Sequence, residues 1–295
     1  MTRPCLGPEK VRTPPSFEIP AQACDCHMHV FGPYDTFRLG DDRSYTPPEN
    51  DANALLGHLD ELGLDRGVIV TATAYGTDNS STISALKQAP DRLRGVAVLA
   101  ENVTDHELDE MTDANVRGAR VNLFRHQGHS YRGGASLRSL RALAPRLLER
   151  GWHAQVWIHV DDIPEVEPEL KMLGLEIVID HMGRIHGNED RSRPGFQRLC
   201  RMLREGQAWA KISGADRNTV QGAPYDDIAP IALDLLAANP DRIVWGSDWP
   251  HVAYYEGRTP DAGQLLNLLE KWLPEPRLRQ QVLASNPAVL YGFSD

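Results

Sequence analysis

The sequence contains little that would point to a secreted or membrane-bound protein. Its 295 residues include only four cysteines and no pair of CxxC motifs, so neither a disulfide framework nor a zinc knuckle is indicated. No apolar run approaches the ~18 residues of a membrane span, and the N-terminus lacks the apolar core of a secretory signal. We therefore expect a cytoplasmic protein that has no membrane partner.

Positive charge is also scarce. The chain has 31 Lys and Arg residues against 41 Asp and Glu residues, which gives a formal charge of −10. Nucleic-acid binding is not expected, because a phosphate backbone requires a basic face. An anionic small molecule remains compatible with this charge, since a few arginines in one pocket can bind a carboxylate.

Short apolar runs alternate with longer amphipathic segments along the chain, and no linker or change in composition divides it. Eight such runs, each typical of a strand buried on both faces, cover residues 21–30, 66–74, 94–100, 116–124, 153–160, 175–183, 208–214 and 242–250. Helical spacing of leucines between them predicts helices near 53–64, 80–89, 137–151, 193–206 and 227–240, and two more in the tail, 265–293.

This alternation predicts an α/β protein with a (β/α)8 barrel of the TIM type. An open doubly wound sheet is the alternative, but the Gly-rich phosphate fingerprint is absent after the first run. A closed barrel typically takes about 250 residues. We expect a proline-rich extended arm over residues 1–20 and one barrel domain over residues 21–295.

Polar residues at the ends of these runs are the candidates for an active site, because barrel enzymes build it at the carboxyl ends of their strands. His27 and His29 end the first run on the same side of a strand, His181 ends the sixth, and Asp248 ends the eighth. Buried ionisable groups are unfavourable unless they are paired or functional. We expect a catalytic cluster, the alternatives being structural histidines and a carboxylate that caps a turn.

Three further residues lie in or near the same strand ends. His159 alternates with Trp157 in the fifth run, and it either faces the barrel mouth or hydrogen-bonds to a neighbouring loop. Arg120 interrupts the fourth run and Arg217 follows the seventh. Two arginines at the mouth favour an anionic substrate over purely structural ion pairs.

Several motifs, taken together in this order and spacing, resemble the amidohydrolase superfamily, and within it the branch of 2-pyrone-4,6-dicarboxylate lactonase and related lactone-processing enzymes. They are CDCHMHVFGP (24–33), YTPP (45–48), GTDN (76–79), DHMGR (180–184) and WGSDWPH (245–251). The resemblance implies a distorted barrel that hydrolyses or isomerises a carboxylated lactone.

The resemblance also implies roles for individual residues. Asp248 matches the aspartate that deprotonates the attacking water, and His27, His29 and His181 match imidazoles that polarise the lactone carbonyl. Arg120 and Arg217 match arginines that bind the carboxylates of the substrate. Tyr45 and Thr77 match hydroxyl positions of the substrate loops. The chain departs from the pattern at His126, Trp157 and Ala253, where the family has arginine, tyrosine and asparagine. We therefore expect a differently substituted lactone, such as a sulfo- or carboxymuconolactone or an aldarolactone.

Members of the superfamily commonly bind a divalent cation, and the resemblance leaves this open here. The fourth run has no lysine to carry a bridging carboxylate, so a binuclear centre is not expected. We expect a metal-independent site; if a single cation such as zinc is bound, its ligands are expected to be His27, His29, His159 and Asp248. The alternatives to a lactone hydrolase are a zinc- or manganese-dependent decarboxylase of an aromatic acid, a lactone isomerase and a non-catalytic binding protein. The sequence leaves the oligomeric state open, and a homo-oligomer is compatible with it.

Overall fold

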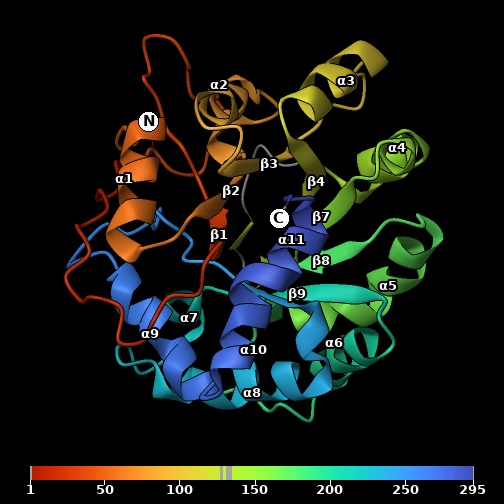
Figure 1. Cartoon of the computed structure of the whole chain (residues 1–295). Coiled ribbons are helices and arrows are strands. Elements are labelled where there is room, and N and C mark those ends of the chain that lie inside the picture. Colours follow the sequence, from red (N-terminus) through yellow and green to blue (C-terminus); the bar gives the residue numbers. More distant parts are fainter. Residues whose placement is uncertain (1, 127–128, 131–134, 295) are drawn as a thin grey trace.

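The computed structural model describes residues 2–126, 129–130 and 135–294, without the side chains of residues 126, 129 and 130. Eight parallel strands form one sheet in the order β1-β2-β3-β4-β7-β8-β9-β10, and Figure 1 shows the helices placed around it. The strands are β1 (Cys24–Met28), β2 (Arg66–Val70), β3 (Leu93–Ala97), β4 (Val116–Asn122), β7 (His153–Trp157), β8 (Ile177–Ile179), β9 (Ala208–Ile212) and β10 (Ile243–Trp245). One strand overlaps each predicted run, and the predicted barrel is confirmed.

The barrel closes between β1 and the segment that follows β10, and this closure involves the candidate catalytic residues. The backbone N–H of Asp248 donates to the carbonyl of His27 at 2.9 Å, and the N–H of His29 donates to the carbonyl of Trp249 at 2.9 Å. Because β10 itself ends at Trp245, the seam is completed by an irregular segment. The polar end of the eighth run is thereby fixed beside the two histidines of the first.

The helices pack around the sheet with their apolar faces inward. They are α1 (Ala52–Leu62), α2 (Ser80–Gln88), α3 (Asp105–Asp113), α4 (Leu137–Glu149), α5 (Ile163–Met172), α6 (Pro194–Arg204), α7 (Ala215–Asn218), α8 (Ala229–Ala238), α9 (Ala262–Trp272), α10 (Pro276–Gln280) and α11 (Asn286–Tyr291). Thr104 and Glu107 form a capping box that begins α3, and Gly63 ends α1 in the left-handed conformation. In the described part of the chain, no helix has both the length and the apolar character needed to cross a membrane.

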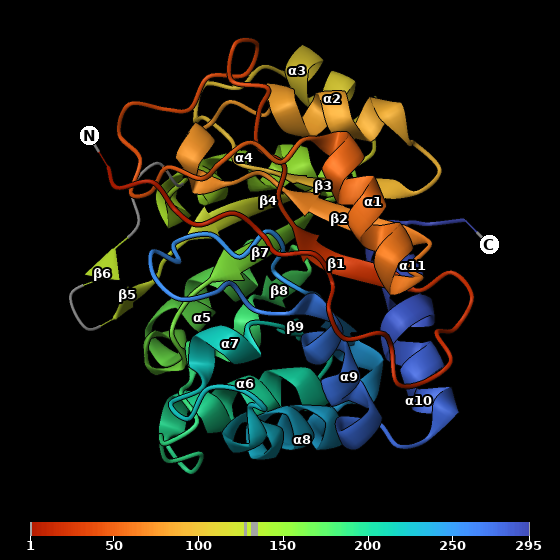
Figure 2. The same cartoon turned by 90° about the vertical axis from the view of Figure 1, so that its left-hand side faces the viewer.

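Two shorter segments complete the fold. A two-stranded antiparallel ribbon, β5 (Arg125–His126) and β6 (His129–Ser130), follows β4. The N-terminal arm is extended and lies across the barrel (Figure 2). Its backbone N–H groups at Cys5 and Leu6 donate to the carbonyls of Thr46 and Tyr254 at 2.8 and 2.7 Å, so the arm connects two loops.

Candidate active site

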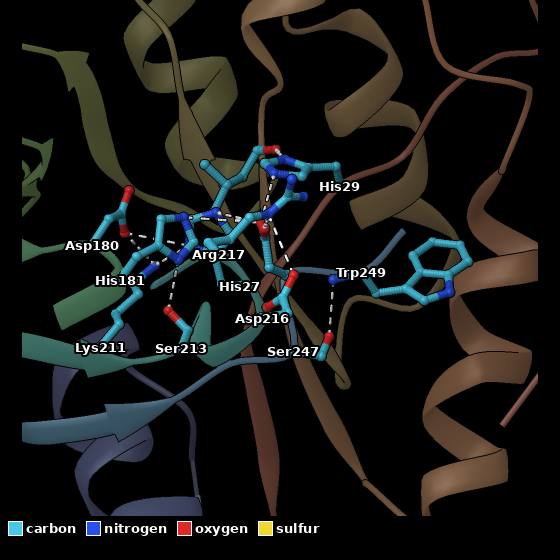
Figure 3. A network of polar contacts seen from close by, with 12 residues as sticks. His27, His29, Asp180, His181, Lys211, Ser213, Asp216, Arg217, Ser247 and Trp249 are labelled. Carbon is cyan, nitrogen blue, oxygen red and sulfur yellow. Dashed lines mark hydrogen bonds and ion pairs between the residues drawn. The ribbon is translucent and has the colours of Figure 1, made fainter. Parts of the chain in front are cut away.

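A carboxylate oxygen lies at the centre of the candidate site. Oδ1 of Asp248 is 3.6 Å from Nε2 of His29, 3.7 Å from Nε2 of His27 and 3.9 Å from Nε2 of His181. All four side chains are buried, and Figure 3 shows the three imidazoles gathered with Arg217. The structure therefore brings together the four residues that the sequence predicts as catalytic.

The backbone around the cluster adopts conformations that side-chain-bearing residues seldom take. Asp248, His181 and Arg184 have φ values of 65°, 51° and 56°, and His251 and Ala253 have φ values of 59° and 62°. Each such conformation costs on the order of 1–3 kcal/mol and persists only where its surroundings enforce it. Their concentration at the ends of β8 and β10 is typical of a functional site.

Arg217 determines the charge state at the centre. Burial favours the neutral form of Asp248, but Arg217, whose Nε lies 3.0 Å from Oδ2, and then His181 hold the pKa of Asp248 well below its ordinary value. Burial lowers the pKa of His181 to about 4 and that of His27 well below its usual range. At neutral pH an ionised carboxylate thus faces at least two neutral imidazoles.

Hydrogen bonds on the far side of the rings indicate where the ring protons lie. Nδ1 of His29 is 2.7 Å from the carbonyl oxygen of Val70. A carbonyl only accepts, so Nδ1 carries a proton, and Nε2 is the ring atom directed at Asp248. Nδ1 of His181 is 2.9 Å from Oγ of Ser213, a hydroxyl that is able to donate or accept.

A pocket opens above this cluster. The pocket is lined by Val252, by Ala253 and by nine residues from strand ends and other loops. These nine are His29, Tyr45, Thr73, Arg120, Trp157, His181, Arg184, Arg217 and Asp248. Four predicted substrate contacts, Tyr45, Arg120, Trp157 and Arg217, are therefore in the lining. Thr77 is exposed and lines other depressions, so the structure does not bring it to this pocket.

A further predicted residue, His159, does not join the cluster. His159 is fully buried, but its Nδ1 accepts the backbone N–H of Asp161 at 3.3 Å and its Nε2 is 3.5 Å from Glu189. Strand β7 ends at Trp157, so alternation no longer relates the directions of Trp157 and His159. His126 belongs to β5, and its side chain lies outside the described part of the structure.

One wall of the pocket is formed by Trp157, Arg120 and Arg184, and these side chains pack with the ring of Phe124 and with one another. The rings of Phe124 and Trp157 stack with centroids 5.3 Å apart and planes 8° apart. The guanidinium carbon of Arg120 lies 5.2 Å from the Trp157 ring centroid, and that of Arg184 lies 5.3 Å from the Phe124 ring centroid. Arg184 belongs to the DHMGR motif but carries no expected role, and the structure adds it as a second cation on this wall.

The same cluster is able to hold one divalent cation. Nε2 of His27 is buried and has no hydrogen-bond partner among the described residues. This atom, Nε2 of His29 and Oδ1 of Asp248 lie within 4.8 Å of one another. Zinc bonds of about 2.0–2.1 Å place neighbouring ligand atoms about 3.3 Å apart, so the three atoms fit such an ion after small shifts.

A parallel barrel whose strand ends bring histidines, a buried aspartate and arginines into one pocket is the arrangement of a barrel enzyme. The amidohydrolase family model matches residues 24–293. The chain belongs to the amidohydrolase family, as its motifs predict.

Named relatives cover almost the whole chain. The 4-sulfomuconolactone hydrolase of Rhizobium radiobacter is 38% identical over 98% of this chain and 96% of its own. The 2-pyrone-4,6-dicarboxylate hydrolase of Comamonas testosteroni is 34% identical over 94% of this chain and 92% of its own. A solved structure, a putative 2-pyrone-4,6-dicarboxylic acid hydrolase from Pseudomonas putida, aligns with a TM-score of 0.77 at 33% identity, covering 95% of this chain and 100% of its own.

Proposed function

We propose that the protein is a hydrolase that opens an anionic lactone. The observation that supports this proposal best is the buried, ionised Asp248, whose Oδ1 faces three imidazole Nε2 atoms while Arg217 binds its Oδ2. A carboxylate held in this way accepts a proton from a water molecule that the imidazoles help to place. The names of the relatives denote anionic lactones as well.

The geometry supports a division of roles among the side chains. A water molecule beside Oδ1 of Asp248 gives one proton to that carboxylate, and Nε2 of His29 accepts a hydrogen bond from its other proton. The resulting hydroxide attacks the lactone carbonyl, and His181 and Arg120 stabilise the negative charge that develops on the carbonyl oxygen. The ring C–O bond then breaks, and the leaving oxygen takes the proton back from Asp248.

The pocket favours a ring that carries a carboxylate or sulfonate group. Arg120, Arg184 and Arg217 all line it, and planar guanidinium groups bind such oxyanions with paired hydrogen bonds. Trp157 also lines the pocket and provides apolar surface for the ring itself. Because Trp157 and Ala253 replace residues of the pyrone lactonase pattern, a sulfo- or carboxymuconolactone or an aldarolactone is the expected substrate.

A single cation such as zinc, when bound by His27, His29 and Asp248, would supply a more acidic water and polarise the carbonyl. The metal-independent site remains our expectation. The decarboxylase alternative required His159 as a ligand, and no observation favours it, because His159 lies beside Asp161 and Glu189. An isomerase would use the same pocket, but it would return a rearranged lactone instead of an open acid.

The test is a screen of sulfonated and carboxylated lactones at pH 8, with products identified by NMR and metal content measured in parallel. We expect ring opening to a free acid, and Asp248→Asn should lower kcat by about 10²–10⁴-fold with KM within about twofold. Asp113→Asn, at an exposed position on α3, is the matched control and should retain full activity. An active Asp248→Asn enzyme, or a rearranged lactone as product, would contradict the proposal.

A further inference from the structure

A lysine is buried in the barrel directly beneath the catalytic cluster. Lys211 on β9 has no exposed surface, and its Nζ donates to the carbonyl of Cys26 at 2.9 Å and to Oε1 of Gln155 at 2.7 Å. The same Nζ is 3.3 Å from Nδ1 of His27 and 3.5 Å from Oδ1 of Asp180. Burying a charge is unfavourable unless it is paired, so this lysine requires an explanation.

The lysine determines which atoms of the neighbouring side chains donate and which accept hydrogen bonds. An ammonium group only donates, so it selects the oxygen of the Gln155 amide and leaves the amide nitrogen pointing away. Nε2 of Gln155 then donates to Oδ2 of Asp180 at 3.0 Å. The other carboxylate oxygen, Oδ1, is left facing Nδ1 of His27 at 3.3 Å. Figure 3 shows Lys211, Asp180 and His27 in one network of polar contacts.

Counting donors and acceptors assigns the ring proton of His27. Oδ2 of Asp180 is 3.4 Å from Nε of Arg120, and Oδ1 is 3.5 Å from Nζ of Lys211, so two cations pair with this buried carboxylate, which as an anion only accepts. If the third lysine proton went to Nδ1 of His27, Oδ1 of Asp180 would be buried without a donor, which is costly. If that proton goes to Oδ1 and Nδ1–H also donates there, Oδ1 and Nδ1 both have a partner. Only Nε2 of His27, which faces Asp248, is then left for a water molecule.

We propose that Lys211 is a positioning residue which, through Gln155 and Asp180, keeps the ring proton of His27 on Nδ1. Nε2 of His27 then presents its lone pair toward Oδ1 of Asp248, 3.7 Å away. Like Nε2 of His29, it is an acceptor for a proton of the attacking water. This catalytic consequence rests on the proposed function, whereas the position of the ring proton does not.

The first test is the ¹⁵N spectrum of the histidine rings in the substrate-free protein. We expect His27, assigned by its loss in His27→Gln, to carry its proton on Nδ1 in the wild type. In Asp180→Asn, Lys211 still orients Gln155, so the new amide turns its oxygen to Gln155 and its NH₂ group to His27. The ring proton should therefore move to Nε2. A wild-type ring protonated on Nε2, or one whose proton does not move in Asp180→Asn, would overturn the proposal.

The second test is kinetic. In other enzymes, replacing the carboxylate that hydrogen-bonds to a catalytic imidazole by an amide lowers kcat by up to about 10⁴-fold. We expect Asp180→Asn to lower kcat at least about tenfold, with KM nearly unchanged. Lys211→Met should mix the two ring tautomers and lower kcat in the same way. Lys87→Met, at an exposed position on α2, is the matched control. Unchanged kcat in both barrel variants would also overturn the proposal.

The two proposals fail in distinguishable ways. A protein that opens no lactone would contradict the proposed function, and the ring spectra would still decide where the proton of His27 lies. Lys211→Met leaves the Asp180 charge without its ammonium partner. If this variant fails to fold for that reason, the wild-type spectrum still decides where the ring proton of His27 lies.

Discussion

Asp25 hydrogen-bonds to both sides of the seam where the barrel closes. Its replacement by asparagine tests how the charge of this carboxylate affects the stability of the protein. Its Oδ1 accepts the backbone N–H of His27 at 3.0 Å and that of Ser247 at 2.9 Å, which joins β1 to the segment after β10. Its Oδ2 is buried and has no hydrogen-bond partner among the described residues. Asp25→Asn retains the accepting oxygen and removes the charge, so we expect the variant to keep the seam and gain stability at neutral pH.

The magnitude follows from the pKa. Burial raises the pKa of Asp25 from 3.8 to about 6, against the opposing hydrogen bonds from Ser247 and His27. A carboxyl group whose pKa is higher in the folded state contributes stability below its unfolded pKa, and this contribution is lost as pH rises toward the folded pKa. About two pKa units correspond to about 3 kcal/mol. Above pH ~6 the ionised carboxylate therefore costs up to about 3 kcal/mol, and asparagine has no such cost.

The assay is urea unfolding of the wild type and Asp25→Asn at pH 4 and pH 8. The gain in unfolding free energy of the variant should grow by up to about 3 kcal/mol between the two pH values. Asp25→Ala, which removes both acceptor contacts, should be destabilised at both pH values and should lose activity that Asp25→Asn retains. A stability difference between wild type and Asp25→Asn that is the same at pH 4 and pH 8 would refute the reasoning.

Three further predictions concern the pocket. Arg217→Gln removes the main charge that lowers the pKa of Asp248, so the acidic limb of kcat/KM against pH should move to higher pH. An unmoved limb would contradict that role. His159→Gln should leave kcat within about twofold, whereas His29→Gln should lower it by about 10²-fold or more, and equal losses would argue against the placement of these histidines. Arg184→Met should raise KM about 10–100-fold for anionic lactones, and an unchanged KM would show that this wall does not bind the anion.

The ends of the apolar runs allowed the centre of the site to be predicted from sequence. His27, His29, His181 and Asp248 each follow a run of buried residues. Parallel strands in a barrel bring such ends to one face, whatever lies between them in sequence. The same reasoning fails once the strand has ended, because alternation then no longer fixes direction. His159 follows β7 by two residues and turns into a loop network with Asp161 and Glu189.

Polar residues that interrupt an apolar strand are a sequence signal for buried polar contacts. Arg120 is predicted to face a partner because a charged residue inside an apolar run needs one. Lys211 in AWAKISG and Gln155 in HAQVWIHV interrupt their runs in the same way, and both are fully buried in the barrel beneath the cluster. Their mutual contacts, by contrast, depend on the register of β7 against β8 and of β8 against β9. Periodicity within one run contains no information about that register.

The seam also couples the stability of the barrel to the geometry of the site. Asp248 donates its backbone N–H to the carbonyl of His27, while Asp25 holds the N–H groups of His27 and Ser247 on one oxygen. The distance between Oδ1 of Asp248 and Nε2 of His27 is therefore set by the contacts that close the barrel, and not by either side chain alone. Any variant that loosens the seam should lower kcat in a protein that is still folded, because a shift of about 1 Å in a catalytic contact can cost about 10²-fold in rate.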